Sequence, residues 1–177
     1  MKLKNLLLLL LLSALWGPSF LFIKIAVVEI GPITLAALRI GIAAVILNLW
    51  LIIKGYEFNT SWLFWKKVAI AGLFAQALPF VLISWGEQYI DSSIASILNG
   101  LTPLCTLLIA NFTIADEKMN TAKIAGTVLG FFGLILLVSP KFGGGLDAAA
   151  MGVIAVSLAA LSYGAASASP RPNPLKE

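Results

Sequence analysis

Two basic residues lie inside long apolar stretches of the chain. Lys24 belongs to the stretch 5–28 and Arg39 to the stretch 32–53. A cation at the centre of a membrane helix costs about 2.5–3.5 kcal/mol on insertion scales, so it needs a physical reason. In one interpretation both side chains extend outward to the interface, with Lys24 near Glu29. In the other, both face a central cavity and attract an anionic or zwitterionic substrate. The sequence leaves both open.

The spacing around Lys24 is that of one helix face. Trp16, Phe20 and Lys24 recur every four residues, which places two aromatic rings and an ammonium group in a row. Such a row suits the wall of a substrate cavity.

Prolines and a glycine predict breaks in three of the apolar stretches. Pro18 removes a hydrogen-bond donor from the first, Pro79 from the third, and Gly100 with Pro103 interrupt the fourth. Broken helices near the membrane midplane are typical of transporter binding sites. They are equally typical of packing kinks.

Small and polar residues share neighbouring faces of the fourth stretch. Ser92, Ser96 and Gly100 follow one another at four-residue spacing, beside Asn99, Thr102 and Thr106. One interpretation is close helix packing, with hydroxyls bonded to their own backbone. The other is a cavity lined by Asn99, Thr102 and Gln76. The candidate substrate-binding residues are therefore Lys24, Arg39, Trp16, Phe20, Asn99 and Gln76. Glu87, at the end of the third stretch, is interpreted first as a solvated end-cap and second as a proton or substrate ligand.

The sequence shows no pattern that predicts catalysis or a bound cofactor. It has no histidine, and Cys105 is its only cysteine, so we expect neither a metal site nor a disulfide. No pair of acids shares a membrane-embedded face, and no phosphate-binding glycine loop is present. The basic residues are few and scattered, which argues against nucleic acid as a partner. We expect no enzyme.

Composition points to a membrane as the solvent of this chain. Of its 177 residues, 60% are hydrophobic and 11% are charged, whereas soluble domains carry roughly 25% charged residues. The charged residues are too few, and too clustered, to cover the surface of a soluble domain of this size. The lipid bilayer is therefore the first expected partner.

The apolar stretches predict an all-α, polytopic bundle of transmembrane helices. A helix needs roughly 20 apolar residues to cross the hydrocarbon layer, and the candidates are 5–28, 32–53, 67–89, 92–114, 121–139 and 149–168. The first resembles a signal peptide at its start but runs on without a cleavage site, so we expect a retained helix. Short links between the stretches predict antiparallel neighbours.

The distribution of lysine and arginine predicts the orientation. With a cytoplasmic N-terminus, the inner side collects Lys2, Lys4, Lys54, Lys66, Lys67, Lys118, Lys123, Arg171 and Lys176. The outer side then holds only Lys141. Short cytoplasmic loops retain positive charge, so we expect a multi-pass protein of the cell membrane with its N-terminus inside.

The sixth stretch is the weakest of the set. Residues 149–168 are rich in alanine and serine, and the polar, proline-rich tail 169–177 that follows cannot continue a helix. The composition predicts a helix that either spans marginally or lies at the interface.

Several motifs together resemble the EamA domain of the drug/metabolite transporter superfamily. They occur in the family's order and spacing and cover about residues 6 to 139: Trp16-Gly17 with Phe20 and Lys24, Leu35 to Arg39, Trp85 to Tyr89 running into Ser92 to Ser96, Thr102-Pro103, Glu117, and the fifth helix with Gly126, Gly130 and Gly133. Asp116 departs from the glycine that the family usually has there.

The resemblance implies half of a ten-helix transporter built from two inverted five-helix repeats. Residues 5–139 would form one repeat, and 149–168 would be the first helix of a second, with Tyr163-Gly164 matching Trp16-Gly17. Such a protein moves a small molecule by alternating access. A second copy of the chain or a separate half-transporter would complete the site, although the charge bias argues against one chain inserting both ways. The alternative is a non-transporting membrane subunit or an inactive truncated fragment.

Overall fold

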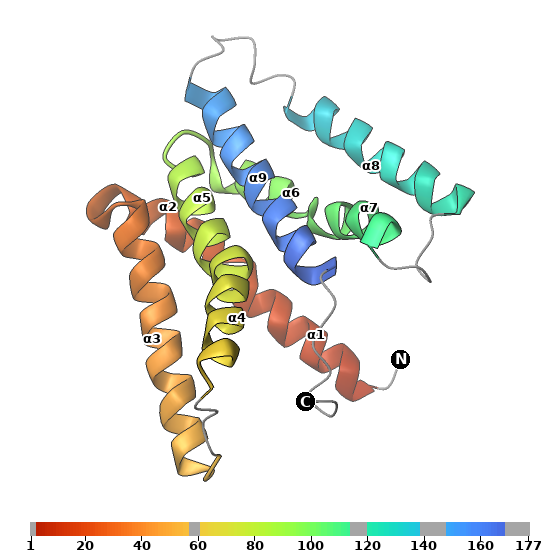
Figure 1. Ribbon diagram of the computed structural model, residues 1–177. Helices are drawn as coiled ribbons and strands as arrows, with labels where there is room; N and C mark the ends of the chain where they lie inside the picture. Colours follow the sequence, from red (N-terminus) through yellow and green to blue (C-terminus); the bar gives the residue numbers. More distant parts are fainter. Residues whose placement is uncertain (1–2, 57–60, 114–119, 139–147, 169–177) are drawn as a thin grey trace.

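The computed structural model describes residues 3–56, 61–113, 120–138 and 148–168, and these residues form helices with no strand (Figure 1). The elements are α1 (Leu3–Trp16), α2 (Ser19–Ile30), α3 (Pro32–Ile53), α4 (Trp62–Gly72), the π-helix η1 (Leu73–Ala77), α5 (Leu78–Gly86), α6 (Ser92–Asn99), α7 (Thr102–Thr113), α8 (Thr121–Val138) and α9 (Ala148–Ala168). The predicted all-α class is confirmed. The tail 169–177 and Glu117 lie outside the described residues.

Five helical stretches among the described residues are long and apolar enough to cross a membrane. They are Leu3–Ile30, Pro32–Ile53, Trp62–Gly86, Ser92–Thr113 and Ala148–Ala168. Three of these stretches join two or more of the helical elements just named.

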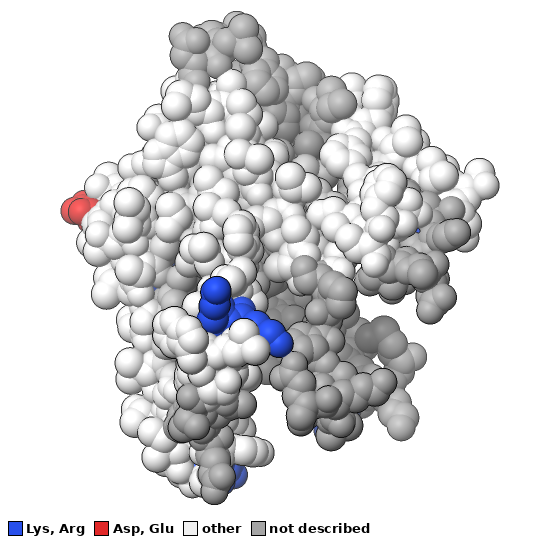
Figure 2. Space-filling model, in the orientation of Figure 1, with Lys and Arg blue, Asp and Glu red and all other residues white. Residues whose placement is uncertain are grey.

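Large apolar side chains cover the outside of the bundle. Leu7, Val45 and Leu129, from three different helices, are each at least 57% exposed. The face in Figure 2 is almost free of charge, apart from basic atoms beside the lower half of α4, a few more at the bottom of the view, and an acidic residue at one edge. Because water would not solvate such a surface, its natural environment is lipid.

Two of the predicted helix interruptions are breaks, and the third, near Pro79, is a π-helix within the continuous helix Trp62–Gly86. The first stretch breaks at Gly17 and Pro18, between α1 and α2, and the fourth at Gly100 and Leu101, between α6 and α7. The third contains the π-helix η1 immediately before Pro79, where the Leu78 N–H donates to the carbonyl five residues back.

Hydroxyl groups satisfy carbonyls near two of these prolines. In π register the partner of the Phe74 carbonyl would be the nitrogen of Pro79, which carries no hydrogen. The Ser162 hydroxyl donates to this carbonyl instead, at 2.7 Å. Pro103 likewise has no N–H for the Asn99 carbonyl, which accepts from the Thr102 hydroxyl at 2.8 Å. Lipid offers no other donor, so these bonds make the breaks tolerable.

The hydroxyls of the fourth stretch bond mainly to nearby backbone. The Ser96 hydroxyl donates to the Ser93 carbonyl, and the Thr106 hydroxyl donates to the Thr102 carbonyl, both at 2.8 Å. For Ser96, Thr102 and Thr106, the packing interpretation is therefore the correct one.

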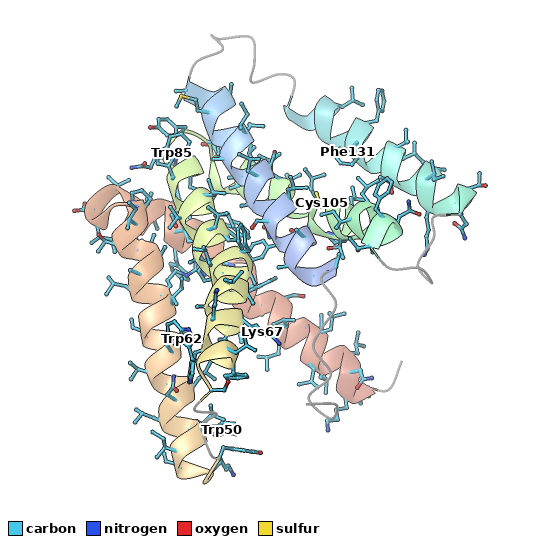
Figure 3. The ribbon with its side chains drawn as sticks, in the orientation of Figure 1. Trp50, Trp62, Lys67, Trp85, Cys105 and Phe131 are labelled. Carbon is cyan, nitrogen blue, oxygen red and sulfur yellow. The ribbon has the colours of Figure 1, made fainter. Side chains whose placement is uncertain are left out.

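Helix α9 lies at the centre of the bundle, packed against α5, α6 and α7 (Figure 1). Its small residues let other helices approach closely. A Cβ atom on Gly152 would lie 2.8 Å from the Gly86 carbonyl oxygen, and one on Gly164 would lie 2.7 Å from the Cys105 Cβ. Figure 3 shows Cys105 where α7 and α9 meet. Helix α9, expected either to span marginally or to lie at the interface, is long and apolar enough to cross a membrane, and its small residues bury it among its neighbours.

Candidate functional site

Four helical stretches and α9 enclose a small cleft that we call the aromatic cleft. It is lined by Trp16, Ser19, Phe20, Ile23, Arg39, Phe80, Ile83, Asn99 and Tyr163, and its volume is about 40 Å³. This is space for roughly two or three water molecules. Three of the contributing stretches are interrupted next to the cleft, which is how their side chains and polar backbone groups come together there.

Arg39 is the cation of the aromatic cleft. It follows the buried residues Leu35 and Ala36 by four and three positions, so it lies on the inward face of α3. Its Nη2 donates to the Ser19 hydroxyl at 3.2 Å. The guanidinium carbon stands 4.5 Å from the centre of the Phe80 ring, which is a cation–π arrangement. The side chain is thereby held in the protein interior.

Asn99 provides an unused acceptor in the same cleft. Its Oδ1 atom is buried and has no hydrogen-bond partner. A buried amide oxygen without a partner is costly, and a ligand or water that donates to it relieves that cost. Asn99 and Arg39 therefore offer an acceptor and a donor to one small polar molecule.

Lys24 lies beyond the aromatic cleft, at the end of α5. Its Nζ donates to the backbone carbonyl of Glu87 and, at 2.9 Å, to that of Ile90. The last carbonyls of a helix have no intrahelical donor, and a lysine can satisfy them. Lys24 therefore points across to the end of α5.

Glu87 is buried beside this lysine. Its side chain is 0% exposed, and neither carboxylate oxygen has a hydrogen-bond partner. It follows the last residue of the Trp62–Gly86 span. Burial raises the pKa of its carboxyl to about 8, while the positive charges of Lys24 and Arg39 act in the opposite direction. The first interpretation of Glu87, as a solvated end-cap, was wrong.

The structure brings most of the predicted site residues together. Trp16, Phe20, Arg39 and Asn99 all line the aromatic cleft. Gln76 is exposed in η1 and lines neither this cleft nor the large groove along α9.

The sequence interpretation missed Ser19, Phe80 and Tyr163 as cleft residues. Phe80 and Ser19 each follow directly on a helix-breaking proline, Pro79 and Pro18. This adjacency was a usable signal, as was the match of Tyr163-Gly164 to Trp16-Gly17.

A larger groove of about 780 Å³ runs between α4, η1, α5 and α9. Its lining is mostly apolar, including Phe74, Leu82 and Leu161, with Lys67 at one end. Because it offers few groups to orient a polar molecule, it suits lipid tails better than a metabolite. We therefore place the site at the smaller cleft.

The sequence comparison settles the family. The EamA-like transporter family matches residues 3–139. The chain belongs to this family. As an EamA-like protein it is a multi-pass membrane protein, in agreement with its apolar helices. In the described part of this EamA-like chain, no group of His, Cys, Asp and Glu could hold a metal ion.

Several curated proteins resemble this EamA-like chain. The uncharacterized transporter YoaV of Bacillus subtilis is 30% identical over 154 residues, which cover 87% of the chain and 52% of YoaV. An uncharacterized transporter in the trpA 3′ region of Buchnera aphidicola is 31% identical over 162 residues, 89% of the chain and 52% of that protein. Protein PagO of Salmonella typhimurium is 31% identical over 121 residues, 67% of the chain and 39% of PagO.

The chain spans about half the length of the curated relatives that it matches. No solved structure matches the chain.

Proposed function

We propose that the chain is one half of an alternating-access transporter for a small anionic or zwitterionic metabolite. Residues 5–139 form one EamA repeat, α9 is the first helix of a second, and the N-terminus is cytoplasmic. Trp16, Phe20, Arg39 and Asn99 contact the substrate. Lys24 contributes positive charge from the end of α5.

The observation that carries this proposal is the meeting of Trp16 and Tyr163 in one cleft. These residues occupy matching positions, each before a glycine, in the first helix of the first repeat and in α9. In inverted-repeat transporters, equivalent helices of the two repeats meet at the substrate site. The presence of Trp16 and Tyr163 in one cleft supports the same relation in this chain.

The substrate class follows from the groups that line the cleft. A guanidinium group has five N–H donors in a planar fork that matches a carboxylate or phosphate. Ser19 accepts from one of the guanidinium nitrogens of Arg39, so donors remain for an anion. The Asn99 Oδ1 atom can accept from an ammonium or hydroxyl group of the same molecule.

A cavity of about 40 Å³ is too small for a metabolite, and ligand pockets usually hold several hundred cubic ångströms, on the order of 300 or more. The rest of the site would come from a second repeat. A further segment of the protein or another chain supplies this second repeat. Rocking of one repeat against the other then opens the cleft.

Flux into proteoliposomes tests this function. The full chain is reconstituted, and uptake of labelled L-glutamate, L-alanine and succinate is followed, with glucose as the uncharged control. We expect uptake of at least one charged probe and none of glucose. Arg39→Ala should reduce that uptake about tenfold or more, because it removes the charge-assisted hydrogen bonds, each contributing about 1.5–3 kcal/mol.

Arg39→Lys and Lys66→Ala are the matched variants for this experiment. Lysine keeps the charge but loses the planar fork, so Arg39→Lys should retain part of the flux. Lys66 is exposed on α4, and its alanine variant should transport as the unchanged chain does. Equal flux in Arg39→Ala and the unchanged chain would contradict the assignment of Arg39.

A non-transporting membrane subunit is the second candidate. The observation that favours it is the central position of α9, which fills the space between α5 and α7. A subunit of this kind would show no flux of any probe, while still forming a stable complex with a partner membrane protein.

A further inference from the structure

We propose that Glu87 is a proton-binding site that sets the net charge of a partly buried cluster with Lys24 and Arg39. This inference rests on the proposed function for its consequence, the coupling of a proton to an anionic substrate. The binding of the proton itself does not depend on transport.

The geometry at Glu87 favours a protonated carboxyl group. The side chain is 0% exposed, and both of its oxygens lack a hydrogen-bond partner. A carboxylate in such a place has lost its hydration without gaining protein donors, which is among the most unfavourable environments for a charge. A neutral carboxylic acid avoids most of this cost. The raised pKa of Glu87 agrees with the geometry.

The positive charge of Lys24 reduces the cost of ionising the Glu87 carboxyl group. The ammonium group donates to the backbone carbonyl of Glu87 itself, so a positive charge lies close to the carboxyl group. This charge stabilises the carboxylate and lowers the pKa of Glu87. Burial and the lysine therefore act in opposite directions, and a group balanced in this way can take up and release a proton near neutral pH.

Few titratable or charged groups lie on the elements around Glu87. Helix α2 carries Lys24 and, at its exposed end, Glu29; α3 carries Arg39 alone, and α9 carries Tyr163 alone. Helices α5 and α6 contain no charged residue, and the intervening turn adds Tyr89 and Asp91. Of these groups, Lys24 and Arg39 are the ones whose charges act on Glu87.

Proton uptake changes the charge presented to a substrate. With Glu87 ionised, the cluster of Glu87, Lys24 and Arg39 has two positive charges and one negative charge. When water delivers a proton to the carboxylate, the negative charge disappears and two positive charges remain. An anion in the aromatic cleft then compensates one of them. Proton binding and anion binding therefore favour each other, and this coupling is reciprocal.

Infrared spectroscopy and thermal unfolding test the proton site in the full chain in detergent. A protonated carboxyl group has its own carbonyl stretching band, which should be present at pH 6 and disappear as pH rises through about 8. The band should be absent from Glu87→Gln and shifted in Glu87→Asp. Glu29→Gln, which changes an exposed carboxyl at the end of α2, should retain it.

The sign of the stability change follows from the same shift. The folded pKa is raised from 4.5 to about 8, so the folded state binds the proton more tightly than the unfolded state does. The melting temperature of the unchanged chain should fall as pH rises across this window. Glu87→Gln should flatten the fall, and Glu29→Gln should not. The proposal would be overturned if Glu87→Gln and the unchanged chain had the same infrared carboxyl band and the same dependence of melting temperature on pH.

Transport separates this inference from the proposed function. Uptake of labelled L-glutamate should increase several-fold with an inward proton gradient, and Glu87→Gln should lose this increase. If uptake requires Arg39 but does not respond to the proton gradient, and the Glu87 infrared band is absent, the proton site is contradicted. The proposed transport function is then still supported. A band with the expected titration but no flux of any probe supports the proton site and contradicts the transporter.

Discussion

Replacing Gly164 with leucine is expected to separate α9 from α7. A Cβ atom at this position would lie 2.7 Å from the Cys105 Cβ and 2.9 Å from the Thr106 backbone nitrogen. Backbone cannot give way as a flexible side chain does, so the two helices must move apart. Overpacking of this kind costs about 1–3 kcal/mol and occasionally more, and we expect a loss of at least about 2 kcal/mol.

The buried Cys105 thiol reports this separation. It is the only cysteine of the chain and is 7% exposed. Labelling by a maleimide in detergent should be about thirty-fold faster in Gly164→Leu, because each 1.4 kcal/mol changes the open population tenfold. The matched control is Gly41→Leu, since a Cβ atom on Gly41 meets nothing within 4 Å. Equal labelling rates in the two variants would contradict the central packing of α9.

Replacing Lys24 with methionine is expected to destabilise the bundle where α2 meets α5. The change removes the donor to the carbonyls of Glu87 and Ile90, and it removes the positive charge next to a buried carboxyl. At about pH 9, where the Glu87 carboxyl is ionised, removing one partner of a buried charged pair costs about 3–5 kcal/mol. The free energy of unfolding in mixed detergent micelles should fall by roughly this amount.

A double-variant cycle separates the charge effect from the loss of the backbone hydrogen bonds. Lys24→Met combined with Glu87→Gln should be less destabilising than the sum of the single changes, by about 1 kcal/mol or more at about pH 9. At about pH 6 the carboxyl is protonated, and this coupling should nearly vanish. Lys66→Met, at an exposed position on α4, controls for the loss of a lysine. Additivity at both pH values would show that Lys24 acts through its hydrogen bonds alone.

Local chemistry allowed much of the fold to be predicted from the sequence. Pro18, Pro79 and Gly100 predicted the three interruptions, because a missing N–H or a flexible residue acts on the backbone within one helical turn. The four-residue spacing of Trp16 and Phe20 predicted that both lie on one wall of a cavity, and the structure places both in the aromatic cleft.

Contacts between distant segments could not be predicted in this way. Lys24 and Glu87 are 63 residues apart, so their meeting depends on how α2 packs against α5. Gln76 was expected to line the cavity, but it is exposed and lies in the π-helix, whose side-chain register differs from that of an α-helix. The alanines and serines of α9 lowered its expected rank as a span, yet its small residues, Gly152 and Gly164 among them, let its neighbours approach closely.

The central claim is that the aromatic cleft binds the transported molecule, and protection from thiol labelling tests it most directly. In a Cys105→Ser background, a cysteine is introduced by Asn99→Cys in the cleft, or by Tyr56→Cys at an exposed position beyond α3. The probe transported best in the flux experiment should slow labelling in the Asn99→Cys chain and leave the Tyr56→Cys chain unchanged. Transport of that probe by the Asn99→Cys chain without protection at position 99 would contradict the claim.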